Sequence, residues 1–527
     1  MTLRPSNAPW RQSLASRLPW IVAATLYVVI LYRTAWVGDD AFITLRSIDN
    51  FVHGYGLRWN VAERVQVFTH PLWMLLWLAV YSVTREPFYT VIAMSLVLSL
   101  TTFLVLQRVS QRTDYLAPLL ATVLAFSRCY VDYSTSGLEN PLSHLLAALF
   151  CWSVLPAYRA NDPARRLRNA ALIAGLAVVN REDHLLIYLP VLIWLVARSE
   201  LGRVKVAWRL ALGALPTLLW TGFSLVYYGF PFPNTAYAKL NVDIPRLTLL
   251  RRGLLYVVDF GRNDPVSALV IVVMFVVVGR FGRPLERALL SGVALYVIYV
   301  ASIGGDFMSG RFFSTPLLVS VILLMVRAPE VRLLPQVAIL LTTLGLSLVP
   351  KHRLWSTEEV SLGKHALSQG IGVVDERLYY FRHASLLYDN PSESVRPWHP
   401  RVFEGLRLKP SGKQVIVRGA VGYFGYFVGV DVHIIDFWAL CDPLLARIPF
   451  RPTGKWRMGH FARKLPLGYE AAVGAGNAKL IQEPTLSNVY ADILLATRAP
   501  LFDKGRWAAI LRLNNGHYTQ ALTTLRY

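Results

Sequence analysis

The chain has 527 residues, of which 54% are hydrophobic and 16% are charged, and its formal net charge is +22 at pH 7. Soluble globular proteins carry roughly a quarter charged residues, so this composition argues against an ordinary soluble protein. A strongly basic chain can indicate nucleic-acid binding. Here, however, the arginines cluster in short connections between apolar runs, as orientation in a bilayer requires. The sequence therefore predicts a membrane protein without a nucleic-acid partner.

Apolar runs occupy most of residues 1–350, and a membrane span needs about 20 mostly apolar residues. The first run, from Leu18 to Tyr32, follows three arginines and has no small-residue cleavage site after it. We therefore expect a retained first span rather than a signal peptide. The pattern predicts a polytopic α-helical domain over 1–350 with about 11 to 12 transmembrane helices. The candidate spans are 18–35, 70–84, 88–106, 115–127, 140–158, 170–180, 184–198, 207–228, 265–280, 288–303, 312–327 and 332–350.

The distribution of arginine and lysine predicts which connections lie in the cytoplasm. The connections richest in arginine are 159–168, 198–205, 280–287 and 327–332, and we place them there together with the N-terminus. The loops then expected outside are those around residue 39 and at 134–140, 181–183, 230–264 and 304–311. This alternation would leave Arg108 and Arg112 outside, although arginines here suggest a cytoplasmic connection. Either the run 70–84 does not fully cross the membrane, or this pair breaks the rule. We favour an incomplete crossing, because the run is short and begins with His70 and Pro71.

Residues 351–527 have a more ordinary composition and predict a second unit. Alternating apolar and polar residues at 413–418 and 431–437 are typical of strands, and glycine, proline and asparagine lie between them. A segment of this length can form one core. We predict an α/β domain outside the membrane, in the periplasm of a bacterial cell whose inner membrane holds the rest.

The first outer loop begins with two adjacent carboxylates, Asp39 and Asp40, directly after the first span. The stretch 41–51 that follows has apolar residues at helical spacing and predicts an amphipathic helix on the membrane surface, ended by glycines. One of the two carboxylates could cap this helix while the other faces a cavity. The expected apolar side consists of Phe42, Leu45, Ile48 and Phe51, and the polar side of Thr44, Arg46 and Asp49.

The other outer loops also carry ionisable groups near a membrane boundary, where such groups are costly and indicate a site. Each group has a local explanation as a helix-start carboxylate, a local ion pair or a surface anchor. Both signs of charge in five outer loops favour a shared outward cavity, in which cations hold a phosphate and a carboxylate acts as a base. The ionisable groups are Glu139, Arg181, Asp183, Lys239, Asp306 and Arg311, and Asn234 adds a neutral polar side chain.

Residues 38–73 read GDDAFITLRSIDNFVHGYGLRWNVAERVQVFTHPLW. This stretch resembles the first external loop of GT-C glycosyltransferases related to mycobacterial arabinofuranosyltransferase B and to the pilin arabinosyltransferases. The shared pattern is a D-D-A-[FY]-I-[ST] start, a G-x-G turn, a [WF]-N-x-x-E-R-V stretch and a T-x-P-L-W helix entry. Further similar segments are TSGLENP at 135–141, NRED at 180–183, YYGFPFPNTAYAKL at 227–240 and GGDFMSGRF at 304–312.

The resemblance implies a GT-C fold with its site at the outer membrane face, a polyprenyl-phosphate sugar as donor and a first-loop aspartate as the catalytic acid or base. It also implies an external C-terminal domain, marked here by D-x-x-x-L-x-D-P at 436–443 and GHFAR at 459–463. The chain departs from the pattern at Asn140, where relatives often have threonine, and at Glu182, where they have proline. The motif is shared by enzymes for different sugars, of which an arabinofuranose is the best guess here.

Asp39 and Asp40 are the predicted catalytic residues. Lys239, Arg311 and Arg181 are expected to hold the leaving phosphate, with His460 as a further candidate. Glu139, Asn234 and Asp306 are expected to position sugar hydroxyls. The predicted donor and acceptor site also includes Glu63, Arg64, His70 and Asp183. The sequence shows no dedicated oxygen cage for a metal, so we predict no metal ligands and no cofactor, although the resemblance leaves a divalent cation open.

Two other functions remain open from the sequence. A transporter or flippase for lipid-linked sugars would share the outward cavity, but internal repeats are not evident. A non-catalytic envelope assembly protein would use aromatic residues of the C-terminal domain to stack on sugars, although alternating aromatic residues also suit buried strands. Those residues are Trp398, Tyr423, Tyr426 and Trp438. For the enzyme, the acceptor could be an arabinan-like glycan, a lipid such as lipopolysaccharide, or a surface protein.

Overall fold

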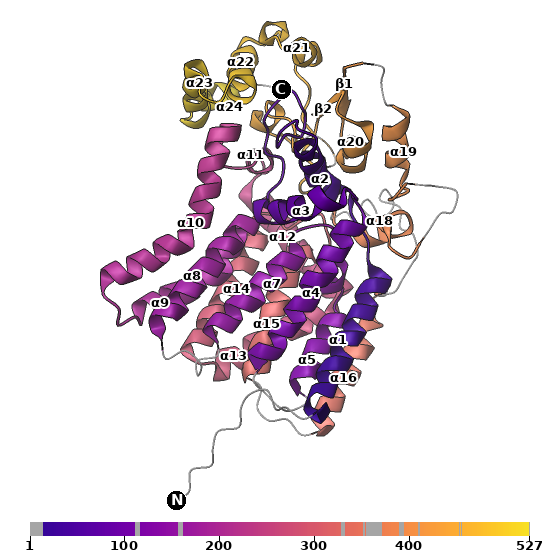
Figure 1. Cartoon of the computed structure of the whole chain (residues 1–527), viewed down its shortest axis with the longest axis vertical. Coiled ribbons are helices and arrows are strands. Elements are labelled where there is room, and N and C mark those ends of the chain that lie inside the picture. Colours follow the sequence, from indigo (N-terminus) through magenta and orange to yellow (C-terminus); the bar gives the residue numbers. More distant parts are fainter. Residues whose placement is uncertain are drawn as a thin grey trace, which may run out of the picture.

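The computed structural model describes residues 14–110, 116–155, 162–327, 333–350, 354, 372–388, 395–408, 412–452, 454 and 456–525. The chain is mostly helical. Long helices from the first two thirds of the sequence form a bundle, and the C-terminal segments lie together at one end of it (Figure 1). Two short helices, α2 (Asp39–Val52) and α11 (Asn234–Leu240), lie at that same end of the bundle.

The bundle is built around helix α15, of which every residue from Ser314 to Met325 is buried. Helix α15 contacts α4, α5, α7, α13 and α14, so an unbroken apolar surface explains its central position. The bundle helices are α1 (Leu14–Thr34), α3 (Pro71–Thr84), α4 (Tyr89–Ser110), α5 (Leu116–Ala125), α6 (Arg128–Tyr133), α7 (Asn140–Val154), α8 (Pro163–Asn180), α9 (Leu185–Ala197), α10 (Arg203–Tyr228), α12 (Arg246–Asn263), α13 (Pro265–Phe281), α14 (Pro284–Ser302), α15 (Ser314–Arg327) and α16 (Leu333–Ser347).

Within the described residues, three helices are long and apolar enough to cross a membrane, namely α4, α10 and α14. Helices α12 and α13 pass this test as a pair but are bent by 110° at the break between them. Other apolar runs form shorter helices. Helix α3, with 14 residues, is about 21 Å long at 1.5 Å per residue, whereas a hydrocarbon core is about 30 Å thick. The structure therefore agrees with several apolar helices, and the total of about 11 to 12 spans stays a prediction.

Helices α8 and α10 approach each other closely through small residues. A Cβ atom added at Gly175 would lie 1.8 Å from the backbone oxygen of Gly213, and one added at Gly213 would lie 2.6 Å from the Cβ of Ala171. Small residues that let helix backbones come this close are typical of membrane helix packing.

We expect Gly213→Ala to lower the Tm of the detergent-purified protein, because overpacking a tight contact costs about 1–3 kcal/mol. Gly222, on the same helix, has no atom within 4 Å of its added Cβ. Gly222→Ala is therefore the matched control and should leave Tm unchanged or raise it slightly, since alanine favours helix. Equal Tm values for the two variants would contradict the close packing.

The C-terminal part contains the two strands expected from the sequence. Strand β1 (Gln414–Arg418) pairs in parallel with β2 (Val432–Asp436), and Gln414 lies opposite Val432. Parallel strands need a crossover connection, which α20 (Gly422–Val428) supplies. The other elements are α18 (Glu376–Ala384), α19 (Pro400–Arg407), η3 (Leu445–Arg447), α21 (Tyr469–Ala475), η4 (Ala478–Leu480), α22 (Pro484–Arg498), α23 (Lys504–Asn514) and α24 (Thr519–Thr524).

The largest apolar cluster runs from the bundle into the C-terminal part. It joins Leu317 of α15 and Phe42 of α2 to Tyr380, Tyr423 and Val432 of later elements. A second cluster lies among β2, η3, α21 and α22, with Ala238 of α11. Residues after 372 thus pack directly against the first outer loop, and a division into domains at residue 350 stays a prediction.

The structure confirms the helix expected after Asp39 but corrects its surroundings. Helix α2 is followed by Gly54, whose φ of 85° suits glycine. Arg46, expected on a water-facing side, is only 3% exposed. It donates to the carbonyl oxygens of Trp59 (2.9 Å), Gly425 (2.5 Å) and Val432 (2.9 Å). The prediction of a free polar side was wrong, because α20 and the segment after it cover that side.

Candidate functional site

Asp39 joins the first outer loop to helix α20. The residue before α2, Gly38, offers no side-chain cap. The Asp39 carboxylate is buried and accepts hydrogen bonds from the backbone N–H groups of Gly422 (3.1 Å) and Tyr423 (3.0 Å). Arg401 Nη1 lies 3.7 Å from its Oδ1. A carboxylate at a helix N-terminus is favourable, so Asp39 is occupied in holding α20 against α2.

Asp40 is in a different position. Consecutive helical residues point about 100° apart, and the Asp40 carboxylate is half-buried and accepts no hydrogen bond from any described residue. Burial raises the pKa of Asp40 to about 6, with a further increase from the negative charge of Asp39, while Arg311 and Lys239 oppose the shift. A carboxylate that is accessible, lacks an internal partner and titrates near neutrality suits a general base.

Glu139 is the centre of a buried charge network beside Asp40. It is 1% exposed and lies just before α7, but its side chain does not cap that helix. It accepts hydrogen bonds from Arg181 Nη1 (2.9 Å) and from Arg311 Nη2 (3.0 Å to each oxygen), and His70 Nδ1 lies 3.4 Å away. Burial alone would raise the pKa of Glu139, but Arg311 and Arg181 together hold it below its usual range.

Arg181 also forms an ion pair with Asp183, which is the local explanation that the sequence offered for these two charges. Its Nε and Nη2 donate to the two Asp183 oxygens at 2.9 and 2.5 Å, and its guanidinium lies 4.7 Å from the centre of the Phe312 ring. All three nitrogens of Arg181 are therefore hydrogen-bonded to carboxylates, which leaves this arginine little capacity for a ligand phosphate.

Arg311 has more capacity left. Its Nε is buried and has no hydrogen-bond partner among the described residues. Its Nη1 is 3.9 Å from Asp306 Oδ2, an oxygen that also lacks a hydrogen-bond partner in this part of the chain. The Asp306 Oδ1 accepts from the backbone N–H of Phe307 at 2.8 Å. Arg311 is thus the arginine of this network with an unused donor near Asp40.

Lys239 is exposed in the last turn of α11. The described residues offer it no ion pair or hydrogen bond. Its positive charge nevertheless lowers the pKa of both Asp40 and His460, so it acts electrostatically on both groups. Lys239 is therefore an exposed cation whose charge acts on the half-buried carboxylate.

His460 lies at the edge of the same cluster. Its ring contacts Phe307 and Trp438 edge-on, with centroids 4.4 and 4.3 Å away. Its Nε2 lies 2.6 Å from Arg457 Nη2. Burial and the nearby arginine lower the pKa of His460 well below its usual value, so the ring is neutral and accepts from Arg457.

Sequence reasoning missed Glu376 and Arg457. Glu376 is buried in the first turn of α18, and burial, with Asp40 and Asp39 adding, raises its pKa to about 8. Arg457 and Arg401 oppose that rise. Glu376 lies in a segment with no membrane-boundary pattern. Arg457, in contrast, lies two residues before the GHFAR motif, which is the one signal that could have indicated it.

Three predicted site residues lie elsewhere and connect segments that are far apart in the sequence. The Asn234 side-chain amide donates to the carbonyl oxygens of Ala439, Leu440 and Asp442 at 3.0 to 3.1 Å. Arg64 Nε donates to the carbonyl of Tyr227 at 3.1 Å.

Glu63 is the third of these residues. It is 2% exposed and lies 3.6 Å from His433 Nε2 and 3.8 Å from Arg498 Nη2. These contacts attach the first outer loop to the C-terminal part. The structure thus brings Asp40, His70, Glu139, Arg181, Asp183, Lys239, Asp306, Arg311 and His460 into one region and does not bring Asn234, Glu63 or Arg64 there.

Metal binding has no support in the described residues, where no group of three or more His, Cys, Asp or Glu side chains could hold an ion.

The chain is mostly helical and apolar, and its half-buried Asp40, with the charges of Arg311 and the exposed Lys239 acting on it, marks a candidate enzyme site at one end of a membrane-type bundle. No known protein-family profile matches the chain. It is 27% identical over 503 residues to a terminal β-(1→2)-arabinofuranosyltransferase of Mycobacterium tuberculosis, a match covering 79% of each chain. It is 28% identical over 443 residues to a protein of the same name from Corynebacterium glutamicum, covering 73% of this chain and 62% of that protein.

Among solved structures, the archaeal oligosaccharyltransferase AglB from Archaeoglobus fulgidus, in complex with an inhibitory peptide and a dolichol-phosphate, aligns with a TM-score of 0.46 and 12% identity. The alignment covers 97% of this chain and 72% of that one. The two arabinofuranosyltransferases confirm the resemblance found in the sequence. The chain is accordingly an enzyme of the glycosyltransferase class.

Proposed function

We propose that this protein is a GT-C glycosyltransferase of the inner membrane. It transfers a sugar, with arabinofuranose as the best candidate, from a polyprenyl-phosphate donor to a glycan, lipid or protein of the cell envelope at the outer membrane face. The observation that carries the proposal is Asp40, which is half-buried, accepts no hydrogen bond from the described residues and lies near Arg311 and Lys239. The sugar is taken from the names of the two relatives.

The arrangement suits one displacement step. The Asp40 carboxylate takes the proton of the acceptor hydroxyl, whose oxygen forms a bond to the anomeric carbon of the donor. The bond from that carbon to the phosphate oxygen breaks, and the phosphate leaves with the bonding electron pair. Lys239 and the unused Arg311 donor stabilise the charge that develops on the phosphate, which is usually the larger contribution to catalysis. Asp40 then releases its proton to water.

The test is transfer by the purified protein in detergent. The reaction would contain polyprenyl-phosphate arabinofuranose and an arabinan oligosaccharide, with mass spectrometry used to detect an acceptor lengthened by one pentose. Product formation without a membrane to cross would also separate the enzyme from a transporter. If the purified protein shows a cooperative thermal melt, and is therefore folded, but forms no product with this donor, the proposal is overturned.

The rate should depend on pH through Asp40. Since its pKa is about 6, the protonated and inactive form dominates below that value and the base form above it. We expect kcat/KM to rise with pH and to level off after an inflection near 6.

The matched comparison for the pH profile is Lys239→Met. This variant removes a positive charge that lowers the pKa of Asp40, so its inflection should move to higher pH. A kcat/KM that does not change with pH through this range, or an inflection that moves down in Lys239→Met, would contradict the assignment of the base.

A further inference from the structure

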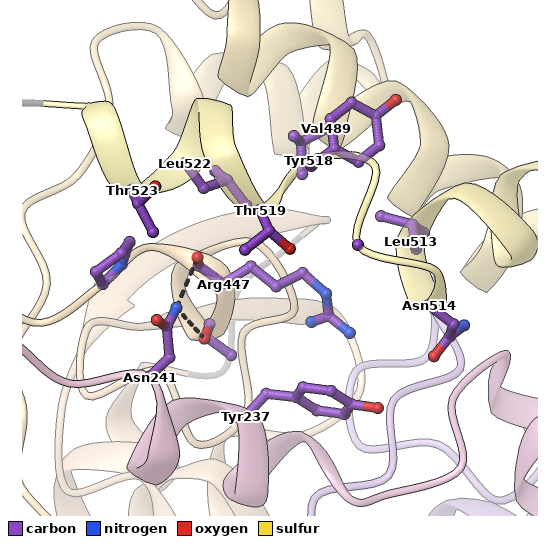
Figure 2. A pocket seen from close by; sticks show the side chains of 13 residues that line it. Tyr237, Asn241, Arg447, Val489, Leu513, Asn514, Tyr518, Thr519, Leu522 and Thr523 are labelled. Carbon is purple, nitrogen blue, oxygen red and sulfur yellow. Dashed lines mark hydrogen bonds between the residues drawn. The ribbon is translucent and has the colours of Figure 1, made fainter.

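A cavity lies between α11, η3 and helices α22 to α24 (Figure 2), and none of Asp40, Glu139, Arg311 and Lys239, which form the Asp40 cluster, lines it. Its volume is about 270 Å³. Tyr237 and Tyr518 contribute aromatic rings to its wall, and Asn514 and Thr519 contribute exposed polar side chains. The guanidinium of Arg447 extends into the space between Tyr237 and Thr519 (Figure 2).

Arg447 is the feature that points to a ligand. Only 9% of this residue is exposed, and its guanidinium lies 4.1 Å from the ring centre of Phe230 and 4.8 Å from that of Tyr237. Its Nη1 donates to Asn234 Oδ1 (3.3 Å) and to the Pro443 carbonyl (2.6 Å). Its Nη2 is buried and has no hydrogen-bond partner among the described residues. A buried charged donor without an acceptor is unfavourable, and an oxygen of a ligand in the cavity would satisfy it.

The lining identifies the class of that ligand. Sites for small polar molecules combine aromatic walls with a few placed hydrogen-bonding groups. Sugar rings offer both an apolar C–H face for tyrosine rings and hydroxyl oxygens for a guanidinium or an amide. A bare inorganic anion would use the arginine but not the two aromatic rings. We propose that this cavity is a saccharide-binding subsite in which Arg447 Nη2 donates to a sugar oxygen.

The position of the cavity relates it to the reaction, and this step rests on the proposed function. Tyr237 and Lys239 are two residues apart on α11, so their side chains point about 200° apart, to opposite sides of that helix. Lys239 is on the side of Asp40, and Tyr237 is on the side of the cavity. The subsite therefore lies across α11 from the reacting groups. It would hold sugar units of the acceptor glycan at a distance from the hydroxyl that reacts.

The experiment is direct binding in the absence of donor, so that it does not depend on transfer. Arabinofuranose oligosaccharides of increasing length are titrated against the full-length protein in detergent, with isothermal calorimetry as the measurement. Thr519→Trp places a large side chain at the exposed rim of the cavity. Gln520→Trp is the matched control, because Gln520 is the next residue of α24, is also exposed and does not line the cavity.

We expect the affinity of the wild type and of Gln520→Trp to rise with oligosaccharide length. Thr519→Trp should bind the longest oligosaccharide roughly 10- to 100-fold more weakly, because the indole would exclude the sugar unit that accepts the charge-assisted hydrogen bond from Arg447. Its Tm should match that of Gln520→Trp. Equal affinity of the two variants, or no binding by the wild type, would overturn the subsite. Binding without transfer would instead overturn the proposed function and leave the subsite standing.

Discussion

Asp40→Asn is expected to lower the rate of sugar transfer by about 10²- to 10⁴-fold, because an amide cannot accept the acceptor proton and general-base assistance is typically worth this much. The substitution keeps the size of the side chain. Asp40 accepts no hydrogen bond from the described residues, so Tm in detergent should change little. Initial rates at saturating donor and a thermal melt of the same preparation measure both quantities.

The neighbouring Asp39→Asn is the matched comparison, and the opposite result is expected for it. This variant weakens the two hydrogen bonds to Gly422 and Tyr423, so its Tm should fall, while transfer well below that Tm should be kept. If Asp40→Asn retained transfer close to that of the wild type, the base would not be Asp40. If Asp39→Asn lost transfer with an unchanged Tm, the base would be Asp39.

The sequence indicates the position of the Asp40 cluster but not which carboxylate is free. Both aspartates lie at the start of one helix, and each could either cap or catalyse. A contact distant in sequence distinguishes them: the backbone N–H of Gly422, 383 residues further along the chain, donates to the Asp39 carboxylate. A Cβ at Gly422 would lie 1.8 Å from the Asp39 carbonyl oxygen. This close approach depends on tertiary packing, which no local pattern contains.

Charges at membrane boundaries could be grouped from the sequence because the bilayer penalises isolated ones. That reasoning correctly brought together Glu139, Arg181 and Arg311. It could not find Glu376, because the C-terminal part has an ordinary composition in which a glutamate has no special cost. Asn234 was misplaced for a different reason: its outer-loop position suggested a ligand contact, whereas its amide donates to backbone carbonyl oxygens.

Helix boundaries were harder to predict than helix positions. The stretch 230–264 was expected to be an outer loop, but it contains α11 and the amphipathic helix α12, which meets α13 at a bend of 110°. Four arginines of α12 interrupt the apolar pattern, so no membrane span could be recognised there. The strands β1 and β2 were predicted well, because their alternation is local.

Glu139→Gln is expected to destabilise the protein by about 3–5 kcal/mol, the usual cost of removing one partner of a buried ion pair. The variant would leave Arg181 and Arg311 buried with one fewer negative charge between them, and these residues are hydrogen-bonded to Glu139 at 2.9 and 3.0 Å. Transfer should fall as well, because Arg311 would move toward Asp306 and away from the leaving phosphate.

Exposed Glu182, two residues before His184 and next to the same arginine, supplies the control. Glu182→Gln removes an equal charge from the surface, where such changes cost little, so it should leave Tm nearly unchanged. Chemical denaturation in detergent and initial rates compare the two variants. If Glu139→Gln and Glu182→Gln unfolded at the same denaturant concentration, the buried network would not stabilise the site. In that case, the position of Arg311 would have to depend on its contacts with Asp306 and Met308.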